Sequence, residues 1–196
     1  MLVFYDSPVS ANTYKVRLLL AQLGRPHQVV RLDLVRGEVR TPDFRRRNPF
    51  GRVPFIEDDG FGLGESNAIL LHLARGTPLL PADPRGQAQV QQWMFFEQNQ
   101  SESAIGLPRI WKKLSIEVPQ AVFDHYAPRA VSALKVLERH LAGRQWLVGD
   151  TYSVADIALF AYTQLAPEAG HDLVPCPAIS AWLQRVRDQP GWLALE

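Results

Sequence analysis

Apolar residues in the first third of the chain alternate between short runs and helical spacing. Leu2–Tyr5 is a compact apolar run bounded by turn residues, which predicts a buried strand. His27–Leu34 mostly alternates between apolar and polar residues and predicts a second strand. Between them, a helix face that ends before Gly24 is predicted from the spacing of Val16, Leu19, Leu20 and Leu23. Strand, helix and strand in this order predict a parallel βαβ unit with a right-handed crossover.

Two further strands and a helix are predicted after this unit. Val53–Ile56 and Phe61–Leu63 are short apolar runs separated by an acidic turn that ends in Asp-Gly, a pattern typical of a hairpin. The segment from Ser66 to about Arg75 predicts a helix, and the Ser66 hydroxyl is placed to cap it. The predicted order β-α-β-α-β-β-α indicates a mixed four-stranded sheet with helices.

The rest of the chain has no convincing strand pattern and predicts an all-helical domain. Ser153 and Asp156 form a capping box, with aspartate in place of the usual glutamate. Three prolines within residues 77–84 predict a linker, because proline continues neither a helix nor a central strand. We therefore expect one domain at residues 1–76 and another at 85–196. Helical patterns are found at Gln87–Gln98, Arg129–Ala142, Val154–Leu165 and Ala178–Asp188.

Composition narrows the class of protein. Hydrophobic residues make up 46% of the 196 residues and charged residues 21%, with a net charge of +1, so neither disorder nor a general attraction to nucleic acid is predicted. No apolar run reaches the roughly 18 residues of a membrane span, and no signal-peptide pattern opens the chain. The single cysteine, Cys176, excludes an internal disulfide and suits a reducing cytoplasm. The five histidines share no ligand spacing, so no metal site is expected.

Three short segments carry the candidate binding chemistry. Ser7–Asn12 leads from the first strand into the first helix and offers hydroxyls and amides at a positive helix end. Arg52–Phe55 places a proline at the start of a strand, and with a cis Val53–Pro54 bond the Val53 backbone would face a peptide-like ligand. Glu65–Asn67 opens the third helix with a hydroxyl, an amide and a carboxylate, which suit an amino acid head group. Taken singly, each segment is explained at least as well as a strand edge or a helix cap.

These segments belong to longer motifs that resemble the glutathione S-transferase family. Asn48–Phe55 and Gly64–Ile69 are similar to the family signatures N-P-x-x-x-V-P and E-S-x-A-I, and Gly149–Ile157 is similar to its G-D-x-x-S-x-A-D motif. The resemblance covers essentially the whole chain, with the motifs in order and properly separated. It implies a thioredoxin-like glutathione-binding domain at residues 1–76, followed by the linker and an all-helical domain at 85–196.

The resemblance also implies roles for particular residues in binding glutathione. Pro54 is expected in the cis form, and the Val53 backbone is expected to pair with the cysteinyl part of the ligand. Glu65 and Ser66 are expected to hold the γ-glutamyl end. Arg52 stands where related members carry a polar side chain that lines the glutathione site.

The side chain that activates the glutathione thiol has three candidates under this resemblance. Serine-type members carry it seven residues before the arginine of a Val-Arg pair in the first helix, and counting back from Arg17 gives Ser10. Asn12 is a nearby donor and the next candidate. Tyrosine-type members use a tyrosine at the end of the first strand, which keeps Tyr5 as the rival. The hydroxyl would donate to the glutathione sulfur and would not itself be a nucleophile.

The implied protein is a cytoplasmic, homodimeric glutathione transferase of the detoxification type, with glutathione as co-substrate and no metal. The glutathione thiolate would attack a small hydrophobic electrophile against the early helices of the second half, where candidate contacts are Tyr14, Ile105, Arg109 and Trp111. The alternatives are a glutathione-dependent isomerase or dehalogenase on the same scaffold, or a non-catalytic protein that binds glutathione or another ligand. No membrane or nucleic-acid partner is expected.

Overall fold

The chain divides into two compact units in a computed structural model that describes residues 1–195. The first unit contains Met1–Arg75 together with the segment from Gln189 onward, and the second contains Gly76–Asp188. The sequence assigned this last segment to the helical half, whereas it belongs to the first unit. The predicted domain boundaries around the linker stay a prediction.

The segment from Gln189 onward is held on the first unit by a hydrogen bond and by close backbone packing. The Tyr14 hydroxyl donates to the carbonyl oxygen of Leu193 at 2.8 Å. Gly191 has a φ of 75°, and a Cβ atom built there would lie 3.0 Å from the carbonyl oxygen of Ala21. Both the backbone conformation and the available space therefore favour glycine at this position.

The first unit is built on a mixed four-stranded sheet, as predicted from the sequence. The strands lie in the order β2-β1-β3-β4, where β1 and β2 are parallel and the other two pairs are antiparallel. The parallel pair with its connecting helix confirms the predicted βαβ unit. The strands span Leu2–Asp6 (β1), Gln28–Arg31 (β2), Phe55–Asp58 (β3) and Phe61–Gly64 (β4).

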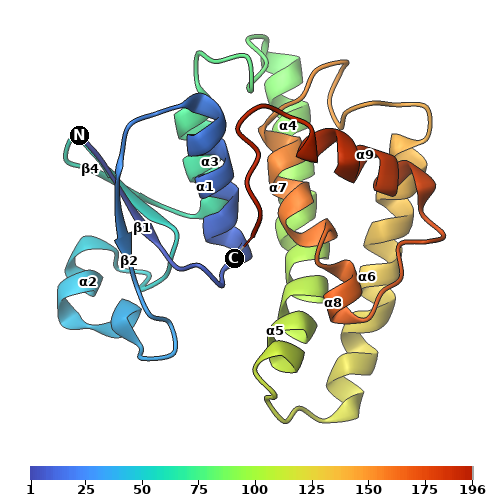
Figure 1. Ribbon diagram of the computed structural model, residues 1–196, viewed down its shortest axis with the longest axis horizontal. Helices are drawn as coiled ribbons and strands as arrows, with labels where there is room; N and C mark the ends of the chain where they lie inside the picture. Colours follow the sequence, from blue (N-terminus) through green and yellow to red (C-terminus); the bar gives the residue numbers. More distant parts are fainter. Residues whose placement is uncertain (196) are drawn as a thin grey trace. The chain divides into compact units, whose positions relative to one another are not determined.

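Three helices cover the sheet. α1 (Ala11–Leu23) and α3 (Ser66–Ala74) pack together on one face, and the short α2 (Pro42–Arg47) lies on the other (Figure 1). A 3₁₀ turn, η1 (Glu38–Arg40), precedes α2. α1 ends where Gly24 adopts the left-handed conformation, as predicted. These helices complete the thioredoxin-like domain that the sequence predicted.

Two local predictions for the first unit were wrong. The cap of α3 is Glu65, and Ser66 is the first residue of the helix. β2 is shorter than the predicted strand His27–Leu34, and its four residues are exposed because it forms an edge of the sheet. Leu32, after the end of β2, is the part of the predicted strand that packs against the cluster on the α2 side, which consists of Tyr5, Val39, Phe44 and Phe55.

The described residues of the second unit form helices joined by loops and contain no strand, as predicted. The capping box at Ser153 and Asp156 is confirmed at the start of a fully buried helix. A π-helix and two short helices add to the four helices expected from the sequence. The elements are α4 (Pro84–Phe96), η2 (Glu97–Gly106), α5 (Leu107–Lys113), α6 (Gln120–Leu141), α7 (Val154–Thr163), α8 (Ala166–Ala169) and α9 (Pro177–Arg187). Among residues 1–195, no helix combines the length and apolar character needed to cross a bilayer.

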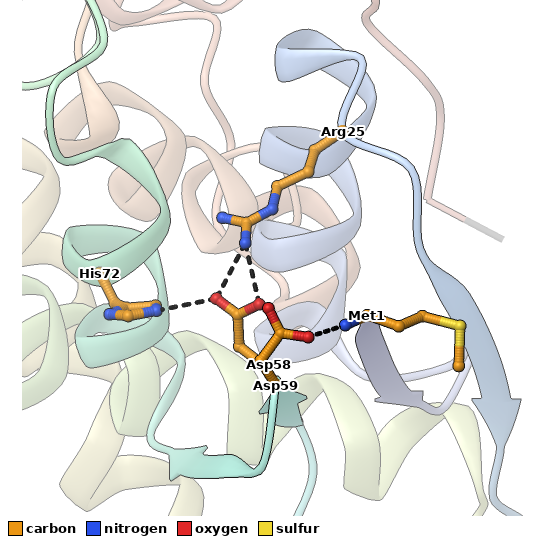
Figure 2. Close-up of polar contacts among 5 residues, drawn as sticks. All are labelled: Met1, Arg25, Asp58, Asp59 and His72. Atoms are coloured by element: carbon orange, nitrogen blue, oxygen red, sulfur yellow. Dashed lines mark hydrogen bonds and ion pairs between the residues drawn. The ribbon is translucent and has the colours of Figure 1, made fainter.

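Asp58, at the end of β3, ties two helices of the first unit to the sheet (Figure 2). Its carboxylate accepts hydrogen bonds of 2.8 and 2.9 Å from Arg25, which follows α1, and lies 3.2 Å from Nε2 of His72 on α3. The neighbouring Asp59 pairs with the amino group of Met1. Partial burial raises the pKa of the Asp58 carboxyl, but the hydrogen bonds from His72 and Arg25 outweigh it and hold that pKa below its ordinary value of 3.8.

We expect Asp58→Asn to lower the free energy of unfolding by about 1 kcal/mol at neutral pH. The pKa of Asp58 is lower in the folded than in the unfolded protein. Its carboxylate therefore stabilises the fold above the unfolded pKa of about 3.9, and this contribution disappears as the pH falls through the folded pKa. Urea unfolding at a series of pH values should show the difference between wild type and variant shrinking in acid. The exposed Asp59 supplies the control, Asp59→Asn, and a difference for Asp58→Asn that does not change with pH would contradict this explanation.

Candidate functional site

The starts of α1 and α3 are joined by a side-chain hydrogen bond. The Ser66 hydroxyl, at the start of α3, donates to Oδ1 of Asn12 on α1 at 3.0 Å. Ser66 is buried, whereas Asn12 is half-buried. The structure thus brings together two segments that the sequence singled out separately.

Ser10 is the N-cap of α1, and its hydroxyl oxygen accepts a hydrogen bond there, so the hydroxyl proton can be donated to another acceptor. Its Oγ accepts a long hydrogen bond of 3.4 Å from the backbone N–H of Thr13. The Thr13 hydroxyl donates to the carbonyl oxygens of Ser7 and Ser10, at 2.7 and 2.9 Å, and so holds the loop before the helix. A half-buried hydroxyl at a positive helix end is suited to donate to an anion.

The hydroxyl of Tyr5, the rival to Ser10, already donates a hydrogen bond to another side chain. Its hydroxyl donates to Oε2 of Glu57 at 2.8 Å, and its ring packs against Phe44 and Phe55 on the α2 side of the sheet. Burial and the Glu57 carboxylate raise the pKa of the Tyr5 hydroxyl. Because the Tyr5 hydroxyl already donates to a carboxylate, whereas the Ser10 hydroxyl only accepts from Thr13, the geometry favours Ser10 over Tyr5.

The loop before β3 is held in shape by Asn48. Its side-chain Nδ2 donates to the carbonyl oxygen of Arg52 at 2.7 Å, and its Oδ1 accepts from the N–H of Phe50 at 3.1 Å. The peptide bond between Val53 and Pro54 is cis, as the resemblance implied. Sequence reasoning placed Asn48 in a motif but gave it no role, and the structure shows that it fixes the backbone ahead of Val53.

Glu65 has a backbone conformation that is rare for a residue other than glycine. Its φ is 67° and its ψ is 114°, and its side chain is exposed and does not cap α3. Residues in such conformations cost about 1–3 kcal/mol and cluster at functional sites. This strain supports a functional role for the turn that presents Glu65 and Ser66. The exposure of the other predicted residues varies, since Arg52 is exposed, Val53 is half-buried and Pro54 is buried.

Sequence reasoning missed Lys15 entirely. This lysine on α1 is completely buried, and its ammonium donates a long hydrogen bond of 3.4 Å to Oγ of Ser66. No motif in the sequence marked Lys15, because a lysine in a helix usually indicates an exposed position. Its contact with Ser66 makes it part of the same group of side chains.

The side chains expected to contact an electrophile have other partners. Tyr14 is buried and bonded to the segment after Gln189, and Ile105 is also buried. Arg109 is buried and forms an ion pair of 2.6 Å with Glu168. The remaining candidate is half-buried Trp111, whose ring packs against those of Phe123 and Tyr126. These contacts give no support to the expected electrophile residues. Among residues 1–195, no three His, Cys, Asp or Glu side chains gather so that they could hold a metal ion.

The first unit is thioredoxin-like, the starts of α1 and α3 are joined in it by a hydrogen bond, and a helical unit follows it along the chain. This combination has a counterpart among known protein families. Residues 2–75 match the family described as Glutathione S-transferase, N-terminal domain, and residues 96–190 match the corresponding C-terminal domain. The chain belongs to the glutathione S-transferase family.

Three similar proteins indicate the range of this family. A possible glutathione S-transferase from Rhodopseudomonas palustris has a crystal structure with a TM-score of 0.95 and 41% identity, covering 99% of this chain and 97% of its own. Ure2p in complex with glutathione has a TM-score of 0.89 and 27% identity, covering 97% and 95%. The Escherichia coli K12 protein named Disulfide-bond oxidoreductase YfcG is 29% identical over 199 residues, covering 97% of this chain and 92% of its own. Proteins that match nearly the whole of this chain are thus named for different activities.

Proposed function

We propose that this chain binds glutathione at the starts of α1 and α3 and the loop before β3, ionises its thiol with the Ser10 hydroxyl and transfers the thiolate to a small hydrophobic electrophile. The observation that carries this proposal is the hydrogen bond of 3.0 Å between Ser66 and Asn12. It supports a single site in which the segment suited to an amino acid head group adjoins the segment suited to a thiolate.

The groups in these segments match the chemistry of glutathione. The Ser66 hydroxyl and backbone amide, at the start of α3, suit the α-carboxylate of the γ-glutamyl group, because helix N-termini attract anions. The exposed carboxylate of Glu65 suits the ammonium of the same group. The backbone N–H and C=O of Val53, just before β3, suit the peptide groups of the cysteinyl residue, because each group can pair with its complement on the ligand. Arg52 and Pro54 flank Val53 and complete the proposed glutathione site.

One hydroxyl is sufficient to ionise the thiol. A free thiol with a pKa of about 8.5 is only a few per cent ionised near neutral pH, and lowering this pKa by about two units requires about 2.7 kcal/mol. A hydrogen bond to a charged group supplies about 1.5–3 kcal/mol, and a helix N-terminus supplies about 0.3–1 kcal/mol more. Ser10, as the N-cap of α1, offers both contributions, and Asn12, in the first turn of the same helix, is a second donor.

The alternatives differ in what happens after glutathione binds. An isomerase or a dehalogenase would use the same glutathione site with a different second substrate. Disulfide exchange through a protein thiol is not supported, because burial and the charges of Glu138 and Asp172 raise the pKa of Cys176, the single cysteine of the chain. Such a thiol is protonated at neutral pH and is a weak nucleophile. A non-catalytic protein would bind glutathione and leave the pKa of its thiol unchanged.

The proposal is tested by titrating the ultraviolet absorbance of glutathione thiolate bound to the wild-type protein. We expect a thiol pKa about two units below that of free glutathione, with turnover of small aromatic halides or activated alkenes. A bound thiol with the pKa of free glutathione would favour the non-catalytic alternative. If the protein turns over only isomerisable substrates, only halides that lose halogen or only disulfides, the corresponding reaction replaces glutathione transfer as its function. If the protein does not bind glutathione, the proposal is overturned. The homodimer and the cytoplasmic location expected from the sequence stay predictions.

A further inference from the structure

Lys15 is a completely buried cation in contact with one residue of the proposed glutathione site. Its ammonium donates to Oγ of Ser66 at 3.4 Å, and Ser66 donates in turn to Oδ1 of Asn12 at 3.0 Å. Burying an ammonium costs several kcal/mol unless its partners are well placed. A leucine would fill the same helix position without this cost, and the contact with Ser66 connects the buried charge with the proposed head-group site.

We propose that Lys15 is a positioning residue that holds the Ser66 hydroxyl as a hydrogen-bond donor to the α-carboxylate of the γ-glutamyl group. This inference rests on the proposed function. An ammonium group only donates hydrogen bonds, so the lone pair of Ser66 that faces Lys15 is occupied by that donor. The Ser66 proton must then point away from Lys15, and a carboxylate, which only accepts, is its natural partner.

The charge on Lys15 also strengthens the bond that Ser66 donates. A hydroxyl that accepts from a cation is polarised, and its own donated hydrogen bond becomes stronger in a buried setting. The Ser66 proton is directed to Asn12 in this structure, and the ligand carboxylate would take it over. Recognition of the head group would thereby change the hydrogen bonding of Asn12, which lies two residues after Ser10.

The test compares two ligands on wild type and Lys15→Met. One ligand is glutathione, and the other is γ-aminobutyryl-cysteinylglycine, which differs only by lacking the α-carboxylate. Titration calorimetry should show roughly tenfold weaker binding of glutathione by Lys15→Met, and nearly unchanged binding of the analogue. The exposed lysine of α6 supplies the control, Lys135→Met, which should bind both ligands as wild type does.

A second arm tests whether Lys15 acts through Ser66. Adding Lys15→Met to Ser66→Ala should weaken glutathione binding no further than Ser66→Ala alone, because the hydroxyl that Lys15 positions is already absent. Equal losses for both ligands, or additive losses in the double variant, would show a merely structural role and overturn the inference. If Lys15→Met does not fold, Lys15→Gln replaces it in the same comparison under the same criteria. Failure of the wild type to bind glutathione refutes the proposed function itself, whereas wild-type binding without a ligand-dependent loss in the variant refutes only the role of Lys15.

Discussion

Replacing Ser10 by alanine is expected to raise the pKa of the bound glutathione thiol by about one to two units and to lower kcat roughly tenfold to a hundredfold near neutral pH. The reason is the loss of a hydrogen bond to a charged sulfur, which is worth about 1.5–3 kcal/mol. Glutathione affinity should change little, because Ser66 and Val53 bind other parts of the ligand in this proposal. The thiolate absorbance titration measures the pKa, steady-state kinetics measure kcat, and calorimetry measures the affinity.

Tyr5→Phe is the matched control for this experiment, since it removes a hydroxyl from the end of β1. The Tyr5 hydroxyl donates to Glu57, so its loss should leave the pKa of the bound thiol unchanged. The reverse pattern, with turnover lost in Tyr5→Phe and kept in Ser10→Ala, would make the protein tyrosine-type and refute the assignment of Ser10.

The second large effect is expected for the stability of the helical unit. Asp156→Asn should lower the free energy of unfolding by about 3 kcal/mol. Oδ1 of Asp156 accepts from the Leu147 N–H at 3.1 Å and from Nε1 of Trp182 at 2.9 Å, and Oδ2 accepts from the N–H and hydroxyl of Ser153 at 3.0 and 3.1 Å. An asparagine replaces one of these oxygens by an NH₂ group, which is itself a donor. The two buried donors that bond to that oxygen in the wild type would then face the NH₂ group and lose their acceptor. Urea unfolding, followed by the circular dichroism of the helices, measures the loss.

The form of Asp156 that accepts these bonds is the carboxylate. Burial raises the pKa of Asp156 to about 6, and the four donated hydrogen bonds oppose this rise, so the group is mainly ionised at neutral pH. Asp150→Asn makes the same chemical change at an exposed position a few residues earlier and should alter the stability by less than about 0.5 kcal/mol. Similar losses in the two variants would contradict a specific role for the capping box.

Regular elements of the fold were predictable because their signals are local. The helical spacing from Val16 to Leu23 and the turn at Gly24 gave α1 and its end, and the serine and aspartate of the capping box gave the start of α7. The strand at residues 27–34 was predicted too long because Leu32 and Leu34 continue the apolar alternation beyond Arg31, where β2 ends. The π-helix η2 was not expected, because polar residues in a sequence usually indicate a segment exposed to solvent. Two of its polar residues, Glu97 and Ser101, are buried in the structure.

The candidate site was only partly predictable because its contacts join distant residues. Ser10, Asn12 and Ser66 were named from motifs, but the bond between Asn12 and Ser66 connects positions separated by 54 residues. The role of Lys15 depends entirely on burial, which a single polar residue in a helix does not reveal. The candidate residues Ser10, Asn12 and Ser66 were therefore accessible from the sequence, whereas Lys15 and the hydrogen bonds that link these side chains required the structure.

The return of the segment after Gln189 to α1 makes the first unit discontinuous along the chain. Cutting the chain at the linker would leave these residues on the fragment that carries the helical unit. The Tyr14 hydroxyl would then lose the Leu193 acceptor, and the backbone around Ala21 would be uncovered. On the ribosome, the first unit likewise acquires its last segment only after the helical unit has been synthesised.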